Sequence, residues 1–233
     1  ENVSFLVWTT TPWTLPANMY AAVNPKFEYV EVSGAKLKNG HVIIAAGLRE
    51  TLAKKLGCDL DVVRTIKGAD LIGKEYSPPF DLFAKAGEGH KLWRVIAADF
   101  VTLDAGTGIV HIAPAFGEDD FMAHRKEAGA NLDTASLLCA VKPDGTFIPE
   151  FTRYAGRWVK DCDKEIQAEL KEKNLLVFAE QYRHDYPFCW RADSDPLIQF
   201  ARPAWYIKTT QVKDKAIANN QAVEWFPDHI KDG

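Results

Sequence analysis

The stretch WTTTPWTLPAN, residues 8–18, ends the first apolar run of the chain with three successive threonines and with two prolines that frame a tryptophan. Proline fixes the backbone φ angle, and threonine hydroxyls and backbone amides both form hydrogen bonds. The stretch therefore predicts a rigid, polar turn at the end of a strand. On chemistry alone, an ordinary β-branched strand end with a proline stop is the favoured interpretation.

A second stretch, GTGIVHIAPAFGEDDF at residues 106–121, places a single histidine, His111, within an apolar run. A loop with proline and glycine then leads to three acidic residues, where a helix is predicted over residues 119–128. Acids in a first helical turn complement the helix dipole, and a lone histidine in an apolar strand is commonly a core residue. Taken by themselves, these residues favour that structural interpretation over a functional one.

Short runs rich in valine, isoleucine and aromatic residues surround these two stretches. The runs lie at residues 4–8, 29–32, 41–46, 60–66, 92–97 and 108–113, and helical spacing is found at residues 48–56 and 163–173. Many short strands with few helices predict a mixed α/β, mainly β fold, a closed or nearly closed β-barrel decorated by helices. A parallel doubly wound sheet fits less well, because strands and helices do not alternate.

The domain organisation is predicted from a change in composition. From Tyr182 onward the chain is rich in aromatic residues and proline, so we place a boundary near residue 180. Residues 1–180 are expected to form the barrel core, and residues 181–233 a strap that leads out of it. The chain begins at Glu1 and stops at Gly233 without an obvious finish, which suggests a piece of a longer protein.

Composition and charge exclude several classes of protein. The formal net charge of −4 gives no broad basic surface for a long nucleic acid, although a partner that presents only a nucleic-acid end remains open. The four cysteines are scattered and form no C-x-x-C pair, which is typical of reduced thiols. No signal peptide opens the chain, and no apolar run approaches the about 18–20 residues of a membrane span. We expect a cytoplasmic protein without a membrane segment.

Three catalytic or binding motifs are incomplete or absent. Residues 68–74 have phosphate-loop spacing, but Glu75 follows where a hydroxyl is needed, so a turn between strands is favoured. No G-x-S-x-G sequence supports a serine nucleophile. His184 and Cys189 supply only two of the four ligands that zinc normally takes, and we expect no metal.

Together, and in this order, the two quoted stretches resemble the editing insertion of the class I isoleucyl-, valyl- and leucyl-tRNA synthetases. The string TTTPWTLPAN is the isoleucyl form, since the valyl and leucyl relatives typically carry an arginine at the position of Thr11 and an acid at that of Trp13. Residues 73–80, 186–191, 205–208 and 225–231 agree with the resemblance. One departure is Ala192, where some relatives carry a second cysteine of a zinc knuckle, which weakens a zinc site through Cys189 further.

The resemblance implies hydrolytic proofreading, in which valine wrongly attached to tRNA(Ile) is removed from the terminal adenosine. One methylene distinguishes the two amino acids and supplies only ~1–3 kcal/mol of discrimination, a figure established for this synthetase family itself. A second site that excludes the larger isoleucine by steric clash corrects the remaining errors.

The resemblance also implies a role for each matched residue. Asp120 pairs with the ammonium group of valine, and His111 forms a wall that rejects isoleucine. The threonines contact the adenosine and the ester, and some of their donors stabilise the oxyanion. The expected catalytic residues are thus Asp120, Thr9, Thr10 and Thr11, and the expected substrate-binding residues are His111, Trp13, Thr107 and Asp120. No general base is assigned.

The partners implied are the 3′ end of tRNA(Ile) carrying valine and the rest of the synthetase chain, in a monomer. No cofactor is expected in this domain, since ATP and Mg²⁺ belong to the synthetase body. The alternative is a non-catalytic insertion that docks the tRNA end with a decayed editing site. Valyl or leucyl specificity and an unrelated small-molecule enzyme with a barrel pocket fit the quoted strings less well.

Overall fold

The computed structural model describes residues 2–38, 40–87, 91–129, 137–181 and 186–232, without the side chains of residues 86, 87, 193–195 and 232. The chain forms two compact units, Glu1–Ala201 and Arg202–Gly233. The second unit contains α5 (Lys213–Gln221). The barrel core over residues 1–180 and the strap over residues 181–233 stay predictions of domain organisation.

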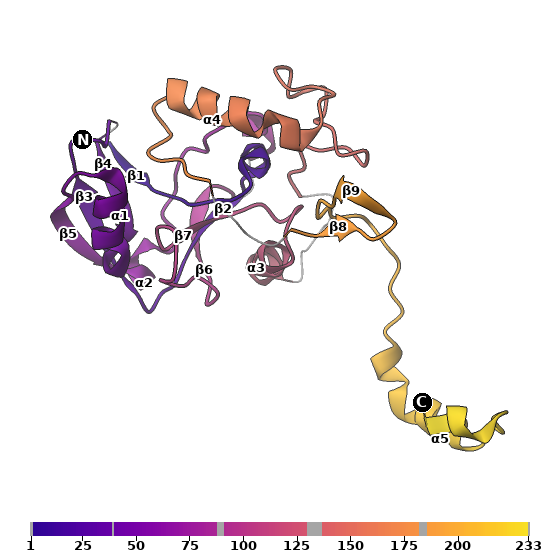
Figure 1. The fold of residues 1–233 in the computed structure, drawn as a ribbon. Coiled ribbons are helices and arrows are strands. Elements are labelled where there is room, and N and C mark those ends of the chain that lie inside the picture. The colour runs from indigo at the N-terminus through magenta and orange to yellow at the C-terminus, as the bar shows by residue number, and fades with distance from the viewer. Residues whose placement is uncertain (1, 39, 88–90, 130–136, 182–185, 233) are drawn as a thin grey trace. The chain divides into compact units, whose positions relative to one another are not determined.

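A four-stranded sheet carries the first helix of the larger unit. Its strand order is β1 (Val3–Phe5), β4 (His41–Ala45), β3 (Glu28–Ser33) and β5 (Asp61–Lys67), with β1 parallel to β4 and the other pairs antiparallel. Helix α1 (Arg49–Leu56) covers one face, where Leu52 and Leu56 join the valines and isoleucine of β3 and β4 in one apolar cluster (Figure 1). The helix ends at Gly57 in the left-handed conformation, as the sequence predicts.

A three-stranded sheet lies in the larger unit. It consists of β6 (Arg94–Ala97), β2 (Tyr20–Val23) and β7 (Ile109–Ile112), with β2 in the middle and buried along its whole length. Strands β2 and β6 are parallel, and β2 and β7 are antiparallel with Ala21 opposite His111. Gly108, at a φ of 72°, lets β7 begin here, because a Cβ atom would lie 2.3 Å from the Cβ of Ala45.

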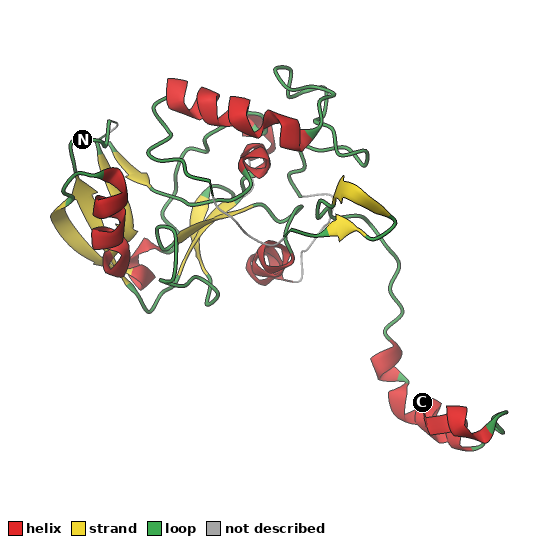
Figure 2. Ribbon diagram, viewed as in Figure 1, coloured by secondary structure: helices red, strands yellow, loops and turns green. Residues whose placement is uncertain are grey.

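The predicted closed or nearly closed barrel is not confirmed, although the mixed α/β class is. Within the described residues the strands form open sheets of four, three and two strands, the last from β8 (Phe188–Cys189) and β9 (Ala192–Pro196) (Figure 2). A bridge between Trp8 and Val110 links the two larger sheets. Strand β5 stays an outer strand with six of its seven residues exposed, and no other strand of the described residues pairs with its free edge.

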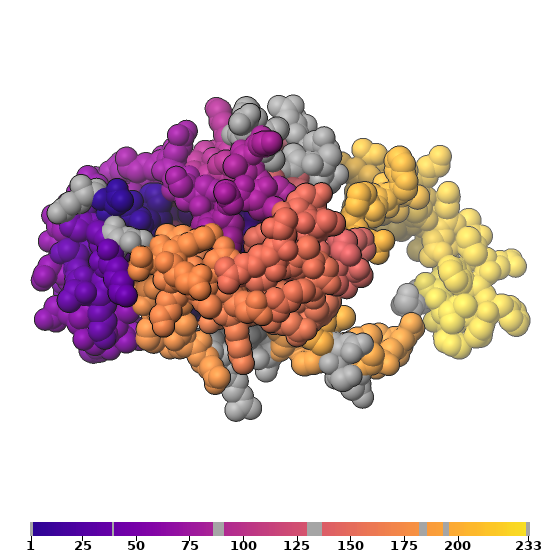
Figure 3. Space-filling view, turned by 90° about the horizontal axis from the view of Figure 1, so that it is seen from above, coloured from indigo at the N-terminus to yellow at the C-terminus, as the bar shows by residue number. Residues whose placement is uncertain are grey.

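The remaining helices bring distant segments to the same core. Short helix α2 (Gly68–Leu71) occupies the stretch with phosphate-loop spacing, and α3 (Glu118–Ala128) begins with the three acidic residues. Helix α4 (Asp163–Glu172) buries Ile166 and Leu170 in the cluster that also contains Trp13. The segment that follows α4, orange in Figure 3, lies beside the indigo N-terminal strand. Glu180 of this segment pairs with Lys55 of α1.

Candidate active site

A cavity of about 870 Å³ in the larger unit collects most of the polar residues that the sequence singles out. Strand β1 and the turn after it contribute to the lining, as do α4 and the segment after it. Residues from the start of β2 and from β7 reach the same space. The polar residues that line it include Thr9, Thr10, Asn18, Thr107 and His111.

The threonine turn, residues 9–14, is held by its own hydrogen bonds. The backbone N–H of Thr11 donates to the hydroxyl of Thr9 over 3.0 Å, and the hydroxyl of Thr14 donates to the carbonyl of Thr11 over 2.9 Å. A 3-10 helix, η1 (Pro12–Ala17), continues the turn with a proline at its start, as a rigid turn requires. The exposed hydroxyl of Thr10 has no hydrogen-bond partner among the described residues, so it is available to a ligand in the cavity.

His111 is buried, and both of its ring nitrogens have partners. Nε2 lies 3.1 Å from the hydroxyl of Thr14, and Nδ1 lies 2.8 Å from the amide nitrogen of Asn18. That amide nitrogen also donates to the carbonyl of Tyr20, so it is an NH₂ group and Nδ1 must accept. The proton therefore resides on Nε2. Burial lowers the pKa of His111 to about 4, which makes the ring neutral at neutral pH.

Asn18 is fixed in turn by two aromatic residues. The hydroxyl of Tyr76 donates to its side-chain oxygen over 2.6 Å, and the indole N–H of Trp93 donates to its backbone carbonyl over 3.0 Å. Asn18, Thr14 and Tyr76 lie next to the predicted site residues but were not singled out from the sequence. Asn18 and Thr14 belong to the quoted stretch, so the signal was present, but only the fold shows that they face His111.

Asp120 is the third residue of α3, and its carboxylate is partly withdrawn from water. Oδ2 accepts a hydrogen bond of 2.8 Å from the backbone N–H of Ala113, two residues after His111. Burial raises the pKa of Asp120 to about 6, and the charge of Asp119 adds to this, while the hydrogen bond from Ala113 opposes it. Oδ1 accepts no hydrogen bond from the described part of the chain. Asp120 thus lies beside the strand of His111 but is not among the residues that line the cavity.

The other predicted residues take different positions. Thr107 is buried and lines the cavity, and its hydroxyl donates to the carbonyl of Ile109. Thr11 contacts Thr9 within the turn. Trp13 is only 3% exposed, and its indole packs edge-on against Phe116 with 5.0 Å between ring centroids. The structure therefore brings Thr9, Thr10, Thr107 and His111 together around one space and places the side chain of Trp13 in the core.

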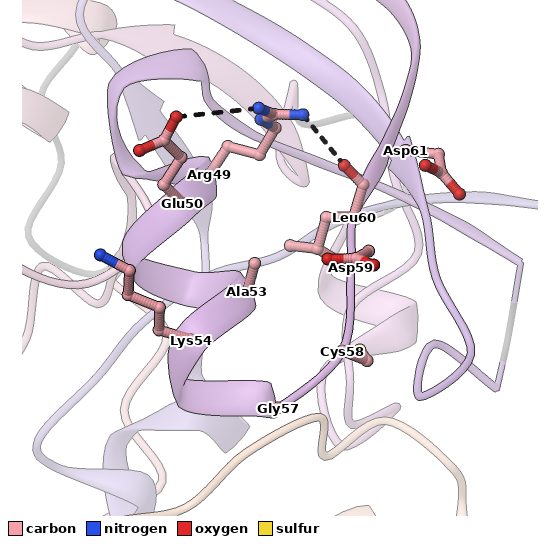
Figure 4. A pocket seen from close by; sticks show the side chains of 9 residues that line it. All are labelled: Arg49, Glu50, Ala53, Lys54, Gly57, Cys58, Asp59, Leu60 and Asp61. Atoms are coloured by element: carbon pink, nitrogen blue, oxygen red, sulfur yellow. Dashed lines mark hydrogen bonds and ion pairs between the residues drawn. The ribbon is translucent and has the colours of Figure 1, made fainter.

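A second hollow, of about 650 Å³, lies along α1 and the loop that follows it (Figure 4). Its lining contains none of the predicted site residues. Arg49 contacts Glu50 over 4.0 Å and donates to the carbonyl of Leu60 over 3.2 Å, so its guanidinium already has protein partners. The larger cavity is therefore the better candidate.

Within the described ranges, no group of three or more histidine, cysteine, aspartate or glutamate side chains could hold a metal ion. His184, from the incomplete zinc motif, lies outside the described residues. None of the described helices combines the length and the apolar character that crossing a membrane demands.

Comparison with known proteins places these features in context. No family model matches the chain. An isoleucine–tRNA ligase of Bacillus thuringiensis (strain Al Hakam) is 44% identical over 233 residues, which are all of this chain and 21% of that protein. A cytoplasmic isoleucine–tRNA ligase of Arabidopsis thaliana is 39% identical over 266 aligned residues, again covering all of this chain and 21% of the relative. The chain thus spans about one fifth of the length of these curated relatives.

Solved structures share the fold at low sequence identity. The crystal structure of GlLeuRS-CP1 matches with a TM-score of 0.57 and 20% identity, covering 77% of this chain and 85% of that one. The editing domain of the P. falciparum cytosolic leucyl-tRNA synthetase matches with a TM-score of 0.54 and 16% identity, covering 73% and 77%. At these identities the comparison establishes the fold alone.

Proposed function

Because the chain is homologous over its full length to one region of the isoleucine–tRNA ligases and has the fold of a synthetase editing domain, we propose that it hydrolyses misacylated tRNA. The substrate is valyl-tRNA(Ile), and the reaction is deacylation at the terminal adenosine. The observation that carries this proposal is the group of polar residues that line the cavity, where Thr14 of the threonine turn contacts His111.

Recognition of the aminoacyl group begins with its charge. The ammonium of the esterified valine is positive at neutral pH, and the carboxylate of Asp120 is ionised above its pKa of about 6. The N–H of Ala113 holds one oxygen of this carboxylate and leaves the other for a ligand. A charge-assisted hydrogen bond of this kind contributes about 1.5–3 kcal/mol, enough to hold the ester in register. The valine must then enter beside the end of β7.

Hydrolysis requires donors for the negative charge that develops on the ester carbonyl. The hydroxyl of Thr10 and the backbone groups of the threonine turn can supply them at the cavity wall. The oxygen of water bonds to the carbonyl carbon, the bond from that carbon to the ribose oxygen breaks, and the ribose oxygen takes up a proton. The products are free valine and tRNA. No side chain is assigned as the general base.

Selectivity against isoleucine follows from the rigidity of His111. The ring is buried, neutral and hydrogen-bonded at both nitrogens, so it cannot turn aside for a larger side chain without breaking two hydrogen bonds. Forcing one extra methylene into a packed space costs about 1–3 kcal/mol. A wall of this kind admits valine and excludes isoleucine.

The decisive experiment measures amino acid released from valyl- and isoleucyl-tRNA(Ile) by the isolated chain and by the full-length synthetase. Preferential release of valine supports the proposal. If the full-length protein binds tRNA(Ile) but releases neither amino acid, the chain is instead a docking insertion with a decayed editing site. Parallel measurement with valyl-tRNA(Val) tests whether the rest of the synthetase, the partner through which tRNA(Ile) is selected, restricts the reaction to its own tRNA.

A further inference from the structure

A carboxylate from a distant helix holds the threonine turn. The backbone N–H of Trp13 donates to Oδ1 of Asp163 over 3.0 Å, and the two residues are 150 positions apart in the sequence. Asp163 is the first residue of α4, and Trp13 is the second residue of η1. This bond therefore joins two elements that only the tertiary fold brings together.

The same bond joins two of the elements that line the cavity. Gln167 and Leu170, four and seven residues after Asp163, lie on the same face of α4 and line the cavity. Thr10 and Pro12 line it from the side of the turn. The hydrogen bond consequently holds the threonine turn against the helix that carries Gln167 and Leu170.

The surroundings of the bond are apolar. Trp13, Cys162 and Ile166 are buried in one cluster, and burial raises the pKa of Asp163 to about 6, while the bond from Trp13 and the charge of Lys160 oppose this rise. Water therefore cannot easily replace the carboxylate as the partner of the Trp13 N–H. The residue after Trp13 is Thr14, which contacts Nε2 of His111, so a shift of Trp13 reaches the histidine directly.

We infer that Asp163 is a positioning residue that fixes the threonine turn against α4 and so sets the width of the cavity around the ester. The inference rests on the proposed deacylation. Asp163 is not among the residues that line the cavity. It acts by orienting the hydrogen-bond donors between Thr9 and Thr14.

The test compares Asp163→Ala and Asp163→Asn in the full-length synthetase, with Asp161→Ala as a matched control. Asparagine keeps an oxygen that accepts from the Trp13 N–H but removes the charge, so it separates this role from stabilisation of the helix dipole. Asp161 is exposed and lies two residues earlier in the chain. We expect Asp163→Ala to lower kcat for valyl-tRNA(Ile) deacylation at least tenfold with a smaller change in KM, and Asp163→Asn and Asp161→Ala to stay near the wild-type kcat.

Hydrogen exchange, followed by mass spectrometry on the peptide over residues 8–18, supplies a readout that does not need activity. Its amides should exchange faster in Asp163→Ala and at the wild-type rate in Asp163→Asn. Unchanged exchange in Asp163→Ala, unchanged kcat despite faster exchange, or failure of Asp163→Asn to restore kcat overturns the inference. If the wild-type protein releases no valine, the proposed function fails, and the exchange rates alone then decide whether the contact holds the turn.

Discussion

Nδ1 of His111 lies 2.8 Å from the side-chain nitrogen of Asn18, and this contact decides which ring nitrogen carries the proton. The same amide nitrogen of Asn18 donates a hydrogen bond to the carbonyl of Tyr20, so it is an NH₂ group and also donates to Nδ1 of His111. His111 is left with a proton on Nε2, directed at Thr14, and with no free lone pair. A histidine in this state cannot act as a general base unless it leaves the network, which agrees with its proposed role as a wall.

Replacing Asn18 by aspartate should reverse this arrangement. A carboxylate only accepts, so the proton should move to Nδ1 of His111, and the new charge should repel the carbonyl of Tyr20. We expect a loss of about 1–3 kcal/mol in the free energy of unfolding and reduced selectivity for valyl-tRNA(Ile). Denaturant unfolding and deacylation assays measure the two effects. Asn24→Asp removes a similar buried donor, to the carbonyl of Val101, and should lower stability while selectivity is kept. Equal selectivity in both variants would contradict the role of Asn18.

Truncating His111 to alanine should open the wall and let isoleucyl-tRNA(Ile) be hydrolysed. The rate of isoleucyl-tRNA(Ile) hydrolysis should rise on the order of tenfold to a hundredfold relative to wild type, because one methylene accounts for about 1–3 kcal/mol of discrimination. Buried His124, which contacts the hydroxyl of Tyr20, offers the same truncation elsewhere in the core. His124→Ala should leave the ratio of released valine to isoleucine unchanged. Undiminished selectivity in His111→Ala would remove His111 from the proposed wall.

The strands and helices of the larger unit were largely predictable from the sequence. Each of the six apolar runs quoted above overlaps a strand, and the helices predicted over residues 48–56, 119–128 and 163–173 are α1, α3 and α4. Strand β2 was missed because Tyr20–Val23 is short and contains two alanines, yet it is the central strand of its sheet. Periodicity identifies strands but not their partners, so the sequence pattern alone does not distinguish open sheets from a barrel.

The sequence predicts those parts of the candidate site that lie within one stretch of the chain, but not the contacts between distant stretches. The threonine turn and His111 were noticed as local patterns, and the cavity that joins them depends on β7 lying beside Trp8. Asp163 could not be connected with Trp13, because an acid at the start of an amphipathic helix is fully explained by the helix dipole. The conspicuous place of Trp13 in the stretch predicts a substrate-binding residue, but it does not reveal that the side chain is buried.

Removing the carboxylate of Asp120 should strongly slow deacylation while the fold persists. Asp120→Ala loses the partner of the ammonium group, worth about 1.5–3 kcal/mol, which corresponds to roughly tenfold to a hundredfold in kcat/KM. Asp119→Ala is the matched control, since Asp119 is the preceding acid in the same helical turn and is exposed. Released valine and the circular dichroism spectrum should be measured for both variants. Retained activity in Asp120→Ala would exclude this carboxylate from the mechanism.

Chelation of zinc should not slow the reaction. The zinc motif near Cys189 is incomplete, with Ala192 at the position where a second cysteine is expected. We expect the rate of deacylation of preformed valyl-tRNA(Ile) to be the same with and without a zinc-selective chelator in a buffer that contains Mg²⁺. A clear decrease that added zinc restores would point to a metal site through Cys189 after all.

The raised pKa of Asp120 predicts opposite responses of activity and stability to pH. Activity should fall as the pH decreases through about 6, because the protonated carboxyl no longer pairs with the ammonium group. Stability behaves differently. The folded protein binds this proton more tightly than the unfolded chain, in which the group has its ordinary pKa of 3.8, so the contribution of Asp120 to the free energy of unfolding increases from pH 6 to pH 4.

Asp120→Asn isolates this contribution, because asparagine still accepts from Ala113 but never ionises. The variant should be more stable than wild type at pH 7, by about 1–3 kcal/mol, and the difference should vanish near pH 4. His111, whose pKa is lowered to about 4, destabilises both proteins equally as the pH falls below 6.5, and it therefore cancels from the comparison. Unfolding free energies measured at both pH values test the sign. If the variant is less stable than wild type at pH 7, the ionised carboxylate of Asp120 is well solvated or already paired in the folded protein. The carboxylate would then not be an unpaired binding group for a cation.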